Sequence, residues 1–335
     1  MHSNQLLFTN KSPEVYFIVI NWNQYALTRD CLVSLQDQDY KDFQVIIVDN
    51  GSTDGSVDRL ENEFDNFFYI KLPENIGYSP GNNAGIEYAL SKGADYIFLL
   101  NNDTIVDRQM LSLLMRVSES SDEIGIVGPT MYFSEPQDKI WAGENVIDWK
   151  KANIIRKEMG EQQKFEILSQ NPPVEVDYID TCAILIKNNV FSHIGEMDGK
   201  YFINFDDLDL NVRSQRAGFK IVYVPAARMW HRVSSSMGFA SPATTYYMTR
   251  NSLLFFWSYA PGLWKIIDVL LIFARTIRTI LAWNLKPGFR NNDQFRRKSA
   301  ANIFALRDFC FGRFGKMGQD VREACYPDQA PSLKI

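Results

Sequence analysis

Residues 44–54 read QVIIVDNGSTD, an apolar run rich in β-branched residues that ends in a polar, turn-forming stretch. Two other apolar runs, VYFIVI at 15–20 and YIFLL at 96–100, are also followed at once by polar residues. Short apolar runs of this kind predict buried strands. The sequence therefore predicts several strands that each end at a polar loop.

Helical segments separate these strands. Cys31 and neighbouring leucines recur at helical spacing within 28–38, and a second helix is expected over 84–91, between strands at 67–72 and 96–100. Apolar strands that alternate with helices indicate a mainly parallel sheet covered on both faces. We predict an α/β fold built on a Rossmann-like nucleotide-binding sheet.

The expected position of a ligand follows from this fold. In open sheets of this kind, ligands bind beyond the carboxyl ends of the strands, and Asn21, Asp49 and Asn101 each directly follow a predicted strand. The pattern loosens over 129–173, and a further strand is expected at 183–186. We expect this second half to shape a cleft for an acceptor molecule.

Composition indicates a globular protein with an uneven distribution of charge. The chain has 335 residues, is 46% hydrophobic and carries a formal net charge of -5. Residues 256–335 hold 13 Lys and Arg against 6 Asp and Glu, a local charge of +7. We expect this part of the chain, and not the acidic remainder, to approach anionic surfaces. No nucleic-acid partner is expected.

The cysteines and the N-terminus bear on the cellular compartment. The four cysteines lie far apart without a Cys-x-x-Cys pair, so we expect neither a zinc knuckle nor a disulfide framework. A reducing cytoplasm fits best. Residues 1–11 are polar and lack the apolar core of a secretory signal, so export is not expected.

Two segments are candidates for binding a nucleotide. The turn from Asp49 to Asp54 can hold the edge of a base or a ribose hydroxyl, although Ser52 or Asp54 could equally be the N-cap of the next helix. Residues 75–85, NIGYSPGNNAG, place glycines and asparagines at a helix start, where backbone N–H groups can approach a phosphate. They match neither a P-loop nor a GxGxxG fingerprint. The alternative is a glycine-rich helix start without a ligand.

Asp103 and His231 are the candidate metal ligands. A hard divalent cation that bridges phosphate oxygens needs only one or two carboxylates from the protein, and Asp103 follows the most apolar strand. The alternative for Asp103 is an Asx turn that caps the next helix. His231 follows the apolar run 221–224, but a lone histidine is more often structural.

Three acids occur within residues 206–209, DDLD. Part of this pattern is ordinary helix-start chemistry, since acids favour the positive end of a helix and Asp209 can pair with Arg213 one turn later. Not all three acids are needed for that. We expect Asp207 to act as a general base that removes a proton from an acceptor hydroxyl.

Residues 263–283, LWKIIDVLLIFARTIRTILAW, form a long apolar segment that carries charges. At 100° per residue, Lys265, Asp268, Arg275 and Arg278 share one face with two threonines, and the rest is apolar. This pattern favours a helix lying at the membrane interface over one that spans the membrane. The alternative is a helix packed on the main domain with an ordinary solvated face.

The ordered set of motifs from about Val15 to about Asn251 resembles the family-2 glycosyltransferases with a GT-A fold, most closely the bacterial rhamnosyltransferase-like branch. The segments that carry the resemblance are Asn21-Trp22-Asn23, residues 48–54, residues 74–77, residues 81–85, residues 100–103, residues 140–143, Gly195 with Asp198, residues 206–209 with Arg213 and Gly218, and His231. Asp206 departs from the usual Glu, Asn101 from the first acid of Asp-x-Asp, and Val233 and Thr181-Cys182 from common glycines. The first two departures leave the metal with fewer charged ligands, so we expect the cation to bind only with the sugar nucleotide present.

The resemblance implies an inverting, metal-dependent transfer in which Asp207 is the catalytic base and Mg²⁺ or Mn²⁺ is held by Asp103 and His231. It implies dTDP-L-rhamnose as donor and a saccharide, free or polyprenyl-linked, as acceptor. The implied nucleotide-sugar positions are Asn21, Asp49, Asn50, Ser52, Asp54, Asn75, Gly77, Asn82, Asn83 and Asn102. The expected acceptor-side positions are Trp141, Asp206 and Asp209.

We accordingly expect a GT-A catalytic domain over 1–255 and a basic, amphipathic, helical region over 256–335 that binds an anionic membrane surface. The protein should lie in the cytoplasm at the inner face of the cell membrane and serve the synthesis of a surface polysaccharide. A second hypothesis is a catalytically inactive scaffold that keeps the nucleotide pocket and docks at the membrane. A third is glycoside hydrolysis, which needs two carboxyl groups on either side of a sugar, an arrangement that neighbours such as Asp206 and Asp207 do not obviously give.

Overall fold

The computed structural model describes residues 12–163, 165–232 and 241–327. The expectations for residues 1–11 and for Val233 lie outside these ranges. The elements of the α/β part are β1 (Val15–Asn21), α1 (Tyr25–Gln36), β2 (Phe43–Asp49), α2 (Ser56–Glu63), β3 (Phe68–Lys71), α3 (Tyr78–Ser91), β4 (Tyr96–Asn101), β5 (Thr104–Val106), α4 (Met110–Ser118), β6 (Ile124–Phe133), β7 (Ile140–Ala142), β8 (Asn145–Asp148), β9 (Asn153–Arg156), α5 (Phe165–Leu168), β10 (Val174–Glu175), β11 (Ala183–Lys187), α6 (Asn188–Ile194), α7 (Asp206–Arg216) and β12 (Lys220–His231). The helices that follow are α8 (Pro242–Tyr259), α9 (Trp264–Leu285), α10 (Pro287–Arg290), α11 (Asp293–Cys310) and α12 (Gln319–Cys325).

The central sheet confirms the predicted α/β fold. Its order is β10-β12-β6-β11-β4-β1-β2-β3, with β5 beside β12 and β7 beside β6. Strands β1 to β4 run parallel, as do β6 and β12, whereas β11 runs antiparallel to both of its neighbours. The strands β1, β2 and β4 are buried almost throughout, which accounts for their continuous apolar runs.

The parallel register brings the predicted polar loops together. Asn21 pairs in register with Asp49, and Ile20 pairs with Asn101, so three strand ends meet at one edge of the sheet. The long strand β12 reaches the same edge and places His231 opposite Thr104 of β5. Residues far apart in the sequence are therefore neighbours at the carboxyl edge.

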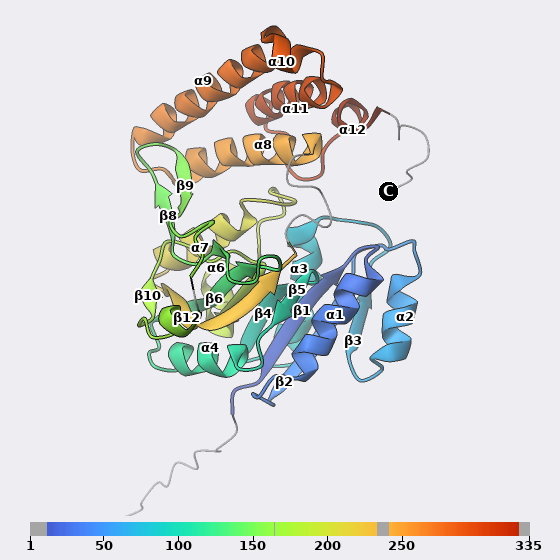
Figure 1. Ribbon diagram of the computed structural model, residues 1–335, viewed down its shortest axis with the longest axis vertical. Coiled ribbons are helices and arrows are strands. Elements are labelled where there is room, and N and C mark those ends of the chain that lie inside the picture. Colours follow the sequence, from blue (N-terminus) through green and yellow to red (C-terminus); the bar gives the residue numbers. More distant parts are fainter. Residues whose placement is uncertain (1–11, 164, 233–240, 328–335) are drawn as a thin grey trace, which may run out of the picture.

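The helices α8 to α12 form a separate layer over this edge, at the top of Figure 1. Helix α8 packs on α9 and α11, and it extends across the expected boundary at residue 255. Arg250 and Asn251 of α8 are fully buried and donate to backbone carbonyls of the loop before α7, including that of Tyr201. The division of the chain at residue 255 remains a prediction.

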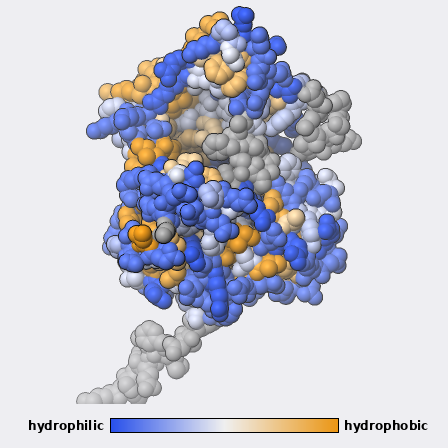
Figure 2. Space-filling model, in the orientation of Figure 1, coloured by the Kyte–Doolittle hydropathy of each residue, from blue (hydrophilic) through white to orange (hydrophobic). Residues whose placement is uncertain are grey.

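Helix α9 confirms the expected helix but presents its faces in an unexpected way. Asp268 is 0% exposed and Thr276 is buried, whereas Leu270, Leu281 and Leu285 are 63%, 52% and 68% exposed. The helix packs on α8 and α11 through a mixed stripe of Asp268, Ile272 and Thr276, so the packing expected by the alternative is present. Its outer face is not an ordinary solvated one, because exposed leucines lie there beside the exposed Arg278. Hydrophobic residues accordingly lie along the upper left margin of Figure 2, where α9 lies in Figure 1. Within the described ranges, no helix meets the length and apolarity needed to cross a bilayer.

Candidate active site

A cavity of ≈ 620 Å³ lies between the carboxyl edge of the sheet and the helical layer. Asp206 and Asp207 at the start of α7 line it, together with Asp180, His231 and Trp141. Side chains of α8, α9 and α11 form the opposite wall. The structure thus brings together the candidate base, one candidate metal ligand and two expected acceptor-side residues, Trp141 and Asp206.

Asp103 and His231 lie in contact at the end of β12. Asp103 Oδ1 is 3.0 Å from His231 Nε2, and both residues are buried. The ring of Trp141 packs edge-on against that of His231, with 4.9 Å between their centroids. Asp103 leads into strand β5, so the alternative of an Asx turn that caps a helix is wrong. His231 is therefore not an isolated core histidine.

The loop before α7 holds Asp207 in place through a strained backbone. Phe202, Asn204 and Phe205 adopt left-handed conformations, with φ of 63°, 64° and 67°, which residues other than glycine rarely adopt. Asn251 of α8 donates to the backbone oxygens of this loop at 2.8 to 2.9 Å. Such strain is maintained only where surrounding contacts impose it, and it is often found at functional sites.

Burial and neighbouring acids raise the pKa values of the carboxyl groups in the cavity. Burial, then Asp180 and then Asp206 raise the pKa of Asp207 well above its usual value. Burial chiefly raises the pKa of Asp206 to about 7. Arg156 acts in the opposite direction on the Asp207 pKa. A carboxylate with a raised pKa is a stronger base than an ordinary aspartate, which suits proton removal near neutral pH.

Asp180 and Arg156 are site residues that the sequence analysis missed. Arg156, at the end of β9, forms an ion pair with Asp180, which also accepts a hydrogen bond from Asn145. The Arg156 guanidinium lies 4.4 Å from the centre of the Trp141 ring. Asp180 precedes β11, which runs antiparallel to β4, so the start of β11 lies at the same edge as the end of β4. A position before a strand gave no sign of this, because a mainly parallel sheet was expected. Nothing local in the sequence marked Arg156.

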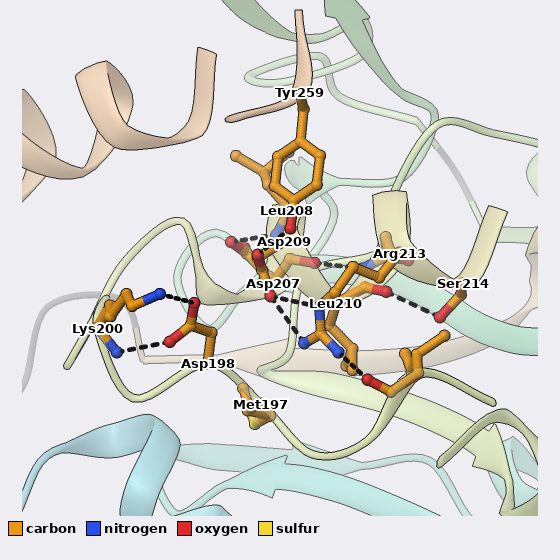
Figure 3. A network of polar contacts seen from close by, with 12 residues as sticks. Met197, Asp198, Lys200, Asp207, Leu208, Asp209, Leu210, Arg213, Ser214 and Tyr259 are labelled. Carbon is orange, nitrogen blue, oxygen red and sulfur yellow. Dashed lines mark hydrogen bonds and ion pairs between the residues drawn. The ribbon is translucent and has the colours of Figure 1, made fainter. Parts of the chain in front are cut away.

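Both carboxylate oxygens of Asp209 are bonded to neighbouring side chains, and one of these is Arg213, as predicted. Arg213 Nη2 lies 2.7 Å from Asp209 Oδ2, and Tyr259 donates a hydrogen bond to the other carboxylate oxygen at 2.5 Å. Figure 3 shows Asp209 between these two partners. Asp209 is 2% exposed and does not line the cavity. Asp209 therefore supports the fold and does not take the expected position on the acceptor side of the cavity.

The turn after β2 is held by a buried network. Asn21 Nδ2 donates to Asp49 Oδ1 at 2.8 Å, and the Ser52 backbone and hydroxyl groups donate to the same carboxylate. Asp54 Oδ1 accepts the N–H of Ser56, the first residue of α2, at 2.9 Å. Asn21, Asp49 and Ser52 thus lie together, whereas Asp54 is exposed and organises the start of the helix.

The next loop packs against this turn. Asn50 donates to the Gly77 carbonyl and accepts the Ile76 N–H, each at 3.0 Å, and Asn75 Oδ1 accepts the Gly77 N–H at 3.0 Å. Gly77 has φ +106°, and a Cβ there would lie 2.5 Å from the ring of Phe202. Only glycine fits this position. The loop therefore joins the turn after β2 to the segment that precedes Asp207.

Three other expected donor-side asparagines have local partners. Asn82 donates to the Tyr78 carbonyl at 3.1 Å, Asn83 bonds the backbone of Met197 in both directions, and Asn102 donates to the Thr28 hydroxyl at 2.8 Å. These side chains hold α3, the loop before α7 and α1 in position. None of the three lines the cavity, and the same is true of the other expected donor-side residues: Asn21, Asp49, Asn50, Ser52, Asp54, Asn75 and Gly77.

The residues present fit a cation that is shared with a bound diphosphate. Within the described ranges, no three His, Cys, Asp or Glu side chains are grouped closely enough to hold a metal. Asp103 and His231 supply one oxygen and one nitrogen 3.0 Å apart, close enough to contact one ion at bond lengths of about 2.1 Å. Mg²⁺ is commonly held by one or two carboxylates together with substrate phosphates. This donor set agrees with a cation that needs the nucleotide.

The chain is similar to known glycosyltransferases in both sequence and fold. The family model described as glycosyl transferase family 2 matches residues 16–191. The dTDP-rhamnosyl transferase RfbF of Shigella flexneri is 23% identical over 256 residues, which are 72% of this chain and 80% of that protein. The N-acetylglucosaminyl-diphospho-decaprenol L-rhamnosyltransferase of Mycobacterium tuberculosis is 24% identical over 227 residues, 62% of this chain and 72% of that protein.

Among solved structures, the mannosyltransferase PcManGT of Pyrobaculum calidifontis, in complex with GDP-Man and Mn²⁺, superposes with a TM-score of 0.54 at 15% identity. The match covers 91% of this chain and 89% of that one. At this identity the similarity concerns the fold alone, and it agrees with the predicted GT-A architecture.

Proposed function

Since the chain belongs to glycosyl transferase family 2, it is a glycosyltransferase, and we propose that it transfers L-rhamnose from dTDP-L-rhamnose to a saccharide acceptor. The two rhamnosyltransferase relatives support this choice of donor. The name of the mycobacterial relative supports an acceptor saccharide linked through a diphosphate to a polyprenyl lipid. Transfer of this kind would serve the synthesis of a cell-surface polysaccharide.

The observation that carries the proposal is the position of Asp207 in a cavity that also contains His231, next to Asp103. In the proposed reaction the acceptor oxygen attacks the anomeric carbon as the bond to the nucleoside diphosphate breaks. Asp207 takes the proton of the acceptor hydroxyl, and the configuration at the anomeric carbon inverts. The raised pKa of Asp207, caused mainly by burial, gives it the basicity for this step.

We assign the nucleotide to the carboxyl edge of β1 and β2. Asp49 and Ser52 would contact the base or ribose, and the fully buried Asn21, whose amide donates to both of them, would hold them in place. Asn50, Asn75 and Gly77 would shape the loop that faces the diphosphate. Asp54, Asn82, Asn83 and Asn102 would support these segments without direct contact.

Asp103 and His231 would hold Mg²⁺ or Mn²⁺ together with the donor diphosphate. The ion would neutralise negative charge that grows on the leaving group. His231 Nδ1 is buried and has no hydrogen-bond partner among the described residues, so the ring has no second contact that fixes its tautomer. The Mn²⁺ in the mannosyltransferase complex supports a divalent ion in this fold.

We further propose that residues 256–335 dock the enzyme on the inner face of the cell membrane. The outward apolar stripe of α9 and the local positive charge support this, since apolar side chains on one face and cations nearby favour an anionic interface. Flotation of the full-length protein with vesicles of anionic or neutral lipid would test the docking. Failure to float with anionic vesicles at low salt would contradict it.

The test of the catalytic proposal is transfer by the Asp207→Asn variant. Transfer should fall by about 10²–10⁴-fold, because a general base contributes on that scale, while binding of dTDP-L-rhamnose in the presence of Mn²⁺ is retained. Asp65→Asn, which changes an exposed acid outside the cavity, is the matched control. Full transfer by the Asp207 variant, or a loss confined to donor binding, would contradict the assignment.

A further inference from the structure

The wall of the cavity that faces Asp207 comes from the helical layer and is polar. The face of α9 that contacts the protein contributes Arg275, Thr276, Thr279 and Trp283 to this wall. Helix α8 adds threonines, and the hydroxyl of Thr249 donates to Asn302 of α11 at 2.8 Å. A hydroxyl-rich wall with one cation and one indole therefore lies across the cavity from the base.

The orientation of α9 exposes more apolar side chains than water alone would favour. An amphipathic helix packed on a soluble domain normally buries its apolar stripe. Here the apolar stripe is exposed at Leu270, Ile277 and Leu281, while the carboxyl oxygens of the buried Asp268 have no hydrogen-bond partner within the described part of the chain. Burying polar groups without partners costs free energy. Asp268 itself does not line the cavity, whereas Thr276 and Thr279 on the same face do, so a polar ligand in the cavity can contact that part of the face.

Arg275 lies on the border between the two faces of α9. Its side chain is exposed, lines the cavity and bonds only weakly, through Nη1 to the Ala152 carbonyl at 3.3 Å. No acid lies within ion-pair distance of it among the described residues. A guanidinium in this position is available for a phosphate group, with which it makes charge-assisted bidentate hydrogen bonds.

We propose that α8, α9 and α11 form the acceptor subsite, in which Arg275 binds the diphosphate that links the acceptor saccharide to its lipid. Thr276 and Thr279 take hydroxyls of the saccharide, and the Trp283 ring takes the apolar face of a sugar. The lipid then continues along the exposed apolar stripe of the same helix. This inference rests on the proposed function and extends it by locating the acceptor.

The experiment compares two acceptors that carry the same saccharide, one on a lipid diphosphate and one on a neutral alkyl chain of similar length. Arg275→Ala should raise the KM for the diphosphate acceptor by about tenfold or more, since a charge-assisted bond is lost. The KM for the neutral acceptor and for the donor should change by less than about twofold. Arg116→Ala, on an exposed position of α4, is the control for loss of one arginine.

An equal effect of Arg275→Ala on both acceptors, or no effect on either, would overturn the assignment. The assays are run in neutral detergent and repeated with anionic vesicles. An effect seen only with vesicles means that Arg275 binds lipid headgroups, which also overturns it. Direct binding of the lipid diphosphate saccharide, measured by calorimetry without donor, tests the inference even where no donor supports transfer. Absence of transfer with every donor counts against the proposed function alone.

Discussion

Replacing Asp206 by asparagine should remove a loss of stability that the wild-type protein suffers as the pH rises. The Asp206 carboxyl is buried, and its pKa is raised from 3.8 to about 7, first of all by burial. A pKa that is higher in the folded than in the unfolded state stabilises the fold at low pH. That contribution is fully present below about pH 4 and is lost as the pH rises through about 7.

The size of the effect follows from these two pKa values. Between about pH 5.5 and 8.5 the unfolded carboxyl is ionised throughout, while the folded one loses most of a proton, which costs about 2 kcal/mol. Asparagine keeps the shape of the side chain and cannot ionise. The unfolding free energy of Asp206→Asn should therefore fall by about 2 kcal/mol less than that of the wild type over this range.

Urea unfolding of both proteins at several pH values, with a chelator and without nucleotide, measures this difference. Asp65→Asn removes the same charge from an exposed position and controls for net charge. Because Asp206 also helps to raise the pKa of Asp207, the acid limb of the rate profile for transfer should move to lower pH in Asp206→Asn. Parallel stability curves for the variant and the wild type would refute the reasoning.

Three further substitutions test the support of the site. Arg213→Ala leaves the buried Asp209 carboxylate without its cation and should lower the unfolding free energy by about 3 kcal/mol in urea titrations; a change below about 1 kcal/mol would show that Tyr259 suffices. Gly77→Ala places a methyl group 2.5 Å from the Phe202 ring and should weaken dTDP binding by calorimetry, whereas Gly93→Ala, also at positive φ but in open space, should not. Asn251→Ala frees the loop before α7 and should reduce kcat for transfer more than the donor KM; unchanged kcat would mean that the loop holds its shape without Asn251.

The fold and the position of the site were predictable because both depend on local patterns. Continuous apolar runs and the helices between them indicate a parallel sheet, and such a sheet gathers the residues that follow its strands. Asn21, Asp49 and Asn101 could be placed at one edge on this basis alone. The pairing of Asp103 with His231 needed the family resemblance in addition, since a lone histidine carries no local signal.

What could not be predicted depends on contacts between distant segments. Arg156 reaches the cavity because the β8–β9 hairpin folds over it, and the hairpin sequence does not record that position. In the acidic cluster at 206–209 a residue was wrongly included in the site. Asp209 looks like Asp206 and Asp207 in sequence, and all three were expected there. A helix separates these acids by 100° per residue, so Asp207 meets the cavity while Asp209 meets Arg213.

The orientation of α9 shows a limit of hydrophobic periodicity. Periodicity identifies which residues share a face, but it does not say whether that face meets protein, water or lipid. In a soluble protein the apolar stripe is expected inside, and for α9 that rule holds only for Ile272, Val269 and Phe273, while Leu270, Leu281 and Leu285 are exposed. The proposed acceptor would contact the polar side chains that line the cavity, and the proposed membrane would contact the exposed apolar ones. A helix of that kind suits an enzyme whose acceptor has a sugar at one end and a lipid at the other.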